Sequence, residues 1–160
     1  MTITHELGRL ADAIKQIERE ITAEGTEYDK TIKQGILDAK DQLQRRTQGG
    51  KGLRGSLRAY TPSYRERKRK AGRNVSPVDF LFSGQLWASF TAEFERQGRQ
   101  LKGFLFFRGG RRGSRATNAQ VARGLHADRP FFDLLDDEKQ IIENAVNDAI
   151  EEAFKLSDFD

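Results

Sequence analysis

The sequence predicts an α+β fold with a long N-terminal helical arm and a small antiparallel sheet that is packed by a C-terminal helix. Three observations carry this prediction: a heptad-like apolar stripe at the start, two apolar segments joined by a short polar turn in the middle, and an amphipathic stretch at the end. A chain of 160 residues has room for one domain with an added arm. We expect the arm over residues 1–46 and the core domain over residues 47–160.

The first segment has an apolar stripe with alternating steps of four and three residues, which is typical of a helix with an a/d seam. The stripe consists of Ile3, Leu7, Leu10, Ile14, Ile17 and Ile21. It falters at Glu24-Gly25, where we expect a break, and a second helical stretch then runs to about Arg46. Such a narrow stripe fits two interpretations equally well. The helix lies on its own core, or it is a subunit-interface arm that packs on a neighbouring copy.

The segment over residues 47–76 is rich in glycine and basic residues, and we expect it to be a basic loop. Pro77 suits the first turn of a helix, so we expect a short buried helix over residues 78–88, with a kink near Ser83-Gly84. The core of the domain is expected to contain Leu81, Phe82, Leu86, Trp87 and the Phe104–Phe107 run.

A β-hairpin is predicted after this helix. Phe90, Ala92 and Phe94 alternate with polar residues, which indicates a strand, and the link from Gln97 to Gln100 reads as a turn. The second strand, Leu101 to Arg108, is apolar on both faces. One face is expected to meet the core, and the other a helix or another subunit.

Two helices complete the predicted fold. The first follows a second basic loop at residues 108–116 and covers Asn118 to Leu125. The last begins at Asp136-Asp137-Glu138, since acids are favoured in the first turn of a helix. Its buried face is expected to consist of Ile141, Ile142, Ala145, Val146, Ala149, Ile150, Ala153 and Phe154.

Charge is sorted along the chain into three blocks. Residues 1–44 have a net charge of −3, residues 45–129 have +15, and residues 130–160 have −8. Such clusters of bases are typical of phosphate binding, of docking against acids of another subunit, or of solvated loops. The basic residues that we expect to face DNA or a partner are Arg65, Arg67, Lys68, Arg69, Lys70, Arg73, Arg108, Arg111, Arg112 and Arg115.

The sequence contains no recognisable catalytic pattern. It has no cysteine and two histidines, and no serine has a nucleophile-elbow context. The glycines near residue 110 lack the Lys-Ser/Thr ending of a phosphate-binding loop. We therefore expect no enzyme, cofactor or metal site. We also expect a soluble protein made in a cytoplasm, since there is no apolar run of about 18 residues and no signal-peptide pattern.

The order of motifs over residues 60–155 resembles that of the neck, tail-completion and virion-morphogenesis proteins of tailed bacteriophages. The motifs are Tyr64-x-x-x-Lys68, Leu81-Phe82-Ser83-Gly84-Gln85-Leu86-Trp87-Ala88-Ser89, a hairpin, Asn118-Ala119-Gln120-Val121-Ala122-x-x-Leu125-His126, Arg129-Pro130-Phe131-Phe132 and a closing amphipathic helix. The chain departs from the family pattern in two places. Ser83 stands where a threonine is usual, and Ala127-Asp128 replaces an aromatic-glycine step.

The resemblance implies a structural virion protein that assembles as a ring at the head–tail junction, around the channel through which the genome leaves. Its partners would be further copies of itself, other connector and tail proteins, and genomic DNA through sequence-nonspecific contacts, with no membrane involved. The sequence leaves one alternative function open, a sequence-nonspecific nucleic-acid-binding protein.

Overall fold

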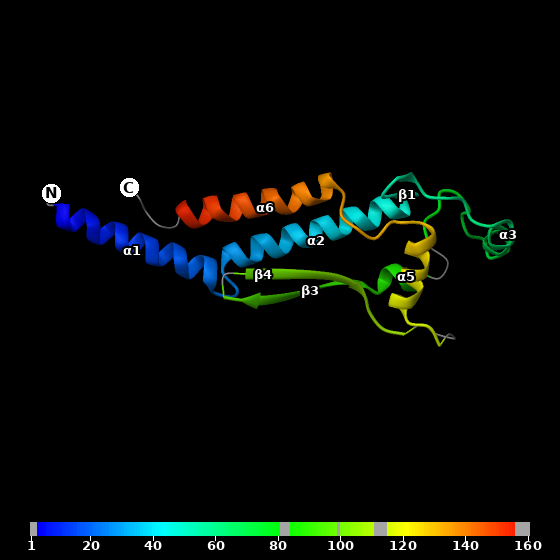
Figure 1. Cartoon of the computed structure of the whole chain (residues 1–160), viewed down its shortest axis with the longest axis horizontal. Helices are drawn as coiled ribbons and strands as arrows, with labels where there is room; N and C mark the ends of the chain where they lie inside the picture. Colours follow the sequence, from blue (N-terminus) through cyan, green and yellow to red (C-terminus); the bar gives the residue numbers. More distant parts are fainter. Residues whose placement is uncertain (1–2, 81–83, 99, 111–114, 156–160) are drawn as a thin grey trace. The chain divides into compact units, whose positions relative to one another are not determined.

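The structure is a computed structural model that describes residues 3–80, 84–98, 100–110 and 115–155, with the helical backbone alone for residues 3–11 (Figure 1). The helices are α1 (Ile3–Thr22), α2 (Glu27–Gln48), α3 (Pro62–Lys70), α4 (Gln85–Ala88), α5 (Asn118–Asp128) and α6 (Asp136–Lys155). The strands are β1 (Lys51–Gly52), β2 (Gly55–Ser56), β3 (Phe90–Gln97) and β4 (Gln100–Phe107). The α+β fold class is confirmed. No helix in the described ranges is long and apolar enough to span a membrane.

The chain forms two compact units. Unit 1 comprises Met1–Asp38, Glu93–Phe104 and Lys139–Asp160, and unit 2 comprises Ala39–Ala92 and Leu105–Glu138. The helices α2 and α6 and the strands β3 and β4 therefore each contribute residues to both units. The expected boundary between the arm and the core domain, at residue 46, lies two residues before the end of α2. The division of the chain into an arm and a core domain stays a prediction.

The predicted break between the first two helices is confirmed, and a buried ion cluster in unit 1 holds it. Asp29 is 1% exposed and lies 2.7 Å from both Arg96 of β3 and Lys33. Arg96 also donates to the carbonyl oxygen of Ile21, at the end of α1. Burial by itself would raise the pKa of Asp29, but hydrogen bonds from Lys33, Arg96 and the Gly25 N–H lower it to about 2.

Unit 1 also depends on two glycines that allow close packing. A Cβ on Gly35 of α2 would lie 2.3 Å from the Cβ of Ala145 on α6, so only a hydrogen fits between these helices. A Cβ on Gly103 of β4 would lie 2.9 Å from the side chain of Ile36. The two positions bring α6 and β4 directly against α2.

An aromatic cluster forms the core of unit 2. The ring centroids of Trp87 and Phe107 are 5.8 Å apart, those of Phe90 and Phe107 are 4.9 Å apart, and those of Phe80 and Phe131 are 4.9 Å apart. Phe131 is completely buried. The prediction that Trp87 is a core residue is confirmed, and each such aromatic pair adds about 0.5–1.5 kcal/mol beyond its buried area.

The hairpin and the C-terminal helix are confirmed, but their expected buried faces need correction. The strands β3 and β4 pair as the predicted antiparallel hairpin. Phe104 on β4 is 45% exposed and Phe154 on α6 is 53% exposed, so neither is a core residue in the described chain. Ala149 and Ala153 are buried as expected, and Phe107 is the buried member of the Phe104–Phe107 run.

The helix expected over residues 78–88 is wrong in its first half, since α4 begins only at Gln85. Phe80 has a positive φ of 53° and Gly84 has a φ of 77°, and a right-handed helix can contain neither conformation. Pro77 therefore does not open a helix. The core assignments of Leu81 and Phe82, and the position of Ser83, lie outside the described residues.

The segment 47–76 is not one loop. Pro62 occupies the first turn of α3, where its missing N–H costs no hydrogen bond. Before it, β1 and β2 form a two-residue antiparallel pair in which Lys51 is opposite Ser56. The basic run from Arg65 to Lys70 is therefore helical, and its charges point in different directions around the helix axis.

Candidate functional site

The basic helix α3 belongs to unit 2, and its inner face packs against other residues of that unit. Tyr64 and Lys68 are four residues apart and so lie on one side of the helix. The Tyr64 ring centroid is 4.9 Å from that of Tyr60, and the Lys68 side chain is 0% exposed. Lys68 Nζ donates to Asp79 Oδ1 at 2.7 Å. The expectation that Lys68 faces DNA or a partner is therefore wrong, because its charge is buried in an ion pair.

Asp79 is the centre of a hydrogen-bond network that joins α3 to the segment before α4. Tyr60 Oη donates to Asp79 Oδ1 at 3.0 Å and accepts from the backbone N–H of Phe80 at 2.8 Å. The indole N–H of Trp87 donates to the Asp79 carbonyl oxygen at 2.9 Å. Burial, together with the nearby Asp79 charge, raises the pKa of Tyr60, so its hydroxyl stays protonated as a donor.

The outer side of α3 is exposed and positively charged. Glu66 is the one acid on this helix, and it pairs with Arg69 at 3.0 Å and with Lys70 at 3.9 Å. The guanidinium of Arg67 lies over the Tyr64 ring at 4.9 Å. The predicted basic residues that are exposed on or just after α3 are Arg65, Arg67, Arg69, Lys70 and Arg73. The structure thus keeps five of the six expected bases of this segment on the outside.

The second basic segment is anchored by Asn118, the first residue of α5. Its buried side-chain amide donates to the carbonyl oxygens of Arg108 at 2.9 Å and Gly110 at 3.4 Å. Thr117 caps the helix through a reciprocal pair of hydrogen bonds with Gln120. Arg108 and Arg115 are exposed, as expected, whereas Arg111 and Arg112 lie outside the described residues.

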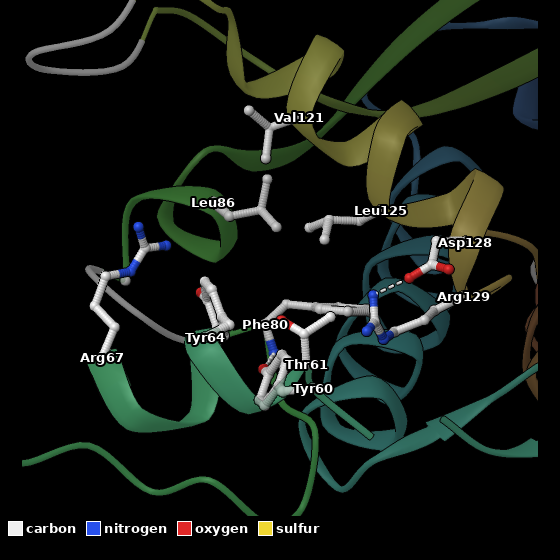
Figure 2. A pocket seen from close by; sticks show the side chains of 11 residues that line it. Tyr60, Thr61, Tyr64, Arg67, Phe80, Leu86, Val121, Leu125, Asp128 and Arg129 are labelled. Carbon is white, nitrogen blue, oxygen red and sulfur yellow. Dashed lines mark hydrogen bonds and ion pairs between the residues drawn. The ribbon is translucent and has the colours of Figure 1, made fainter. Parts of the chain in front are cut away.

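A cavity of about 350 Å³ lies beside α3 in unit 2 (Figure 2). Its apolar lining comes from Tyr60, Tyr64, Phe80, Leu86, Val121 and Leu125. Figure 2 shows Val121, Leu86 and Leu125 along one side of the space, and Tyr64 and Phe80 along the other. The cavity is thus bounded by α3, α4 and α5.

Charged groups stand at two ends of this cavity, Arg67 at one and the Asp128–Arg129 pair at the other (Figure 2). Arg129 is 9% exposed and donates to the carbonyl oxygens of Arg58 at 2.8 Å and Ala59 at 3.1 Å. Its guanidinium also pairs with Asp128, which lies 3.4 Å from Arg58. Arg129 therefore ties the end of α5 to the segment that precedes α3.

The structure describes the side chains of only part of the apolar stripe on α1. Ile14 is 50% exposed, and Ile17 and Ile21 are partly buried. The side chains of Ile3, Leu7 and Leu10 lie outside the described residues, although their backbone is helical as predicted. An exposed isoleucine in the stripe is compatible with the subunit-interface interpretation, which stays a prediction.

No family model, curated protein or solved structure matches this chain. Within the described ranges, no group of three or more potential metal-ligating side chains comes together.

Sequence reasoning did not identify Tyr60, Asp79 or the cavity. One signal was available for Asp79, which is the single acid between Glu66 and Glu93 and stands six positions after Arg73, the last base of the basic segment. An acid that is isolated in this way in an apolar stretch is a good candidate partner for one of the preceding bases.

Proposed function

We propose that this protein is a structural component of a tailed-bacteriophage virion, a neck or tail-completion protein that assembles as a ring at the head–tail junction. It acts by binding neighbouring subunits, and it performs no chemical reaction. Its place is in the assembled virion after synthesis in the host cytoplasm.

One observation carries the proposal: three of the motifs that give the resemblance, those around Tyr64, Trp87 and Arg129, pack together within unit 2. Tyr64 and Lys68 contact Tyr60 and Asp79, and Arg129 lies 5.8 Å from the Tyr60 ring. Trp87 and Phe131 have ring centroids 6.0 Å apart. Motif residues that are 40 or more positions apart in the sequence thus contact one another and together form the core of unit 2. This packing indicates that the residues of these motifs stabilise the fold. Such a role is expected of an architectural protein.

The distribution of charge supports assembly with neighbouring copies. The outer side of α3 is basic, whereas α6 has exposed acids at Asp136, Asp137, Glu143, Asp148, Glu151 and Glu152. A ring requires heterologous contacts, in which one surface of a subunit meets a different surface of the next. Opposite charges on two such surfaces fix the register and suppress wrong pairings.

The arm offers a direct test of assembly. Replacing Leu10 and Ile14 with glutamate should abolish oligomers, since it places charges in the apolar stripe, while the rest of the chain stays folded. Sedimentation velocity measures the oligomers and circular dichroism measures the fold. Normal oligomers from this variant would exclude the arm as the subunit contact.

The exposed bases of α3 favour one second candidate, sequence-nonspecific binding to nucleic acid. If Arg65 and Arg69 contact phosphates, replacing both with glutamine should reduce the slope of log affinity against log salt by about two. The matched control is Arg123→Gln on α5, which also removes an exposed base. Weak binding to duplex DNA with no difference between these variants would exclude this candidate.

A further inference from the structure

The cavity beside α3 has the size and lining of a binding site, and the buried network does not fill it. A volume of about 350 Å³ lies within the range of roughly 300–1,000 Å³ that is usual for ligand pockets. Six of its eleven lining residues are aromatic or aliphatic, and Figure 2 shows them around the space. Such a lining suits an apolar or aromatic group.

The backbone at Phe80 shows that the wall of this cavity is held in an unfavourable conformation. A bulky residue with a φ of 53° is rare and costs free energy, so the surrounding contacts must impose it. The Phe80 N–H donates to Tyr60 Oη at 2.8 Å, and its ring contacts Phe131. Conformations of this kind concentrate at ligand-binding sites, which is a second observation in favour of binding here.

The charges around the cavity favour an occupant with negative charge beside its apolar group. Arg67 is exposed at one end. At the other end, the single carboxylate of Asp128 is matched by two guanidinium groups, those of Arg129 and Arg58. The net charge of these four side chains is positive, so acids next to an apolar side chain would be attracted.

We propose that this cavity receives Phe159 of a neighbouring copy of the chain, with Asp158 and Asp160 placed near Arg67 and Arg129. Residues 156–160 have the sequence Leu-Ser-Asp-Phe-Asp, which supplies an aromatic group between two acids. This segment lies outside the described residues. The inference deepens the proposed function and rests on it, because each copy would offer both the cavity and the segment that fills the next cavity. Contacts of that kind are heterologous, and they form a ring when the rotation from one copy to the next closes.

A labelled peptide that spans residues 150–160 tests the contact directly. The peptide is amidated, so that binding cannot depend on a terminal carboxylate. The receptor is the full-length chain with Phe159→Ser, which leaves its own cavity free. Fluorescence anisotropy should show saturable binding that weakens as salt rises. The Phe159→Ala peptide should bind at least tenfold more weakly, and a peptide with both aspartates changed to asparagine several-fold more weakly.

Receptor variants locate the site. Val121→Glu, which places a charge in the cavity, and Arg67→Glu, on the exposed surface of α3, should each weaken binding at least fivefold. Arg123→Glu is the matched control, because this exposed residue on α5 does not line the cavity, and it should bind as the parent does. Circular dichroism checks that the Val121→Glu chain is folded. If that chain is unfolded, the Arg67→Glu chain still tests the site.

Sedimentation of the Phe159→Ser chain separates this inference from the proposed function. Loss of oligomers together with peptide binding supports the inference. Failure of the peptide to bind, or equal binding by the Phe159→Ala peptide, overturns the inference, and the function survives if oligomers persist. The inference is also overturned if the peptide binds but both the unsubstituted chain and the Phe159→Ser chain are monomers. In that case the segment fills the cavity of its own chain and not that of a neighbour. The proposed function fails separately, if the protein is absent from virions.

Discussion

The buried ion pair between Lys68 and Asp79 gives the sharpest test of the site as described. Replacing Lys68 with methionine keeps an unbranched side chain that is one atom shorter, and it leaves the Asp79 carboxylate without its cation. Lys68 is 0% exposed and Asp79 is 14% exposed, and the pair is 2.7 Å apart. Removing one partner of a buried ion pair costs about 3–5 kcal/mol, because the other charge stays buried and uncompensated. We therefore expect the free energy of unfolding to fall by about that amount.

Urea denaturation followed by tryptophan fluorescence measures this loss, since the chain has one tryptophan and its indole donates to Asp79. The matched control is Lys70→Met, on the exposed side of the same helix, which should change stability by less than about 0.5 kcal/mol. The double variant Lys68→Met/Asp79→Asn should recover part of the loss, because no buried charge remains. If Lys68→Met is as stable as the control, the lysine faces solvent and our account of α3 is refuted.

Two further predictions concern unit 1 and helix packing. The pKa of Asp29 in the folded state is about 2, below its ordinary value of 3.8, so its carboxylate stabilises the fold above about pH 4 and this contribution is lost as the pH falls towards 2. Urea midpoints by circular dichroism between pH 5 and pH 2 should therefore decline more steeply for the wild type than for Asp29→Asn, and parallel declines would contradict the ion cluster. Gly35→Ala should destabilise the protein by about 1–3 kcal/mol, since its new methyl group would overlap Ala145. Gly124→Ala is the matched control in α5, because its methyl group would meet open space and should stabilise the protein by about 0.5–1 kcal/mol. Thermal unfolding measures both variants. A loss of stability in both would exclude close packing as the cause.

Elements with a strong apolar period were predictable from the sequence. The hairpin follows from the alternation in Phe90 to Phe94 and from the turn after it, and both strands lie where expected. The C-terminal helix begins at Asp136 as predicted, and α5 starts at Asn118 but continues three residues beyond Leu125. In each case the local pattern gives the type and position of the element, although Phe104 and Phe154 are exposed where the pattern predicts burial.

The basic helix α3 was not predictable in this way because its inner face has almost no apolar residues. Its contacts with unit 2 are made by Tyr64 and by the aliphatic stem and ammonium group of Lys68. A pattern of apolar residues cannot detect such a face. By charge alone, Lys68 is also indistinguishable from its exposed neighbours Arg67 and Arg69.

The error over residues 78–88 has a different cause. The apolar residues there have helical spacing, but the positive φ of Phe80 breaks the helix, and tertiary contacts with Tyr60 and Phe131 impose that conformation. Those partners are 20 and 51 positions away in the sequence. The cavity could not be predicted for the same reason, since its walls come from three helices that only the fold brings together.

Imaging of phage particles at subunit resolution tests the central claim most directly. The particles are those whose genome encodes this chain. We expect a closed ring of copies between head and tail, with the α+β unit recognisable in each. Mature particles that lack the protein, with the chain found only as single copies outside them, would contradict the account.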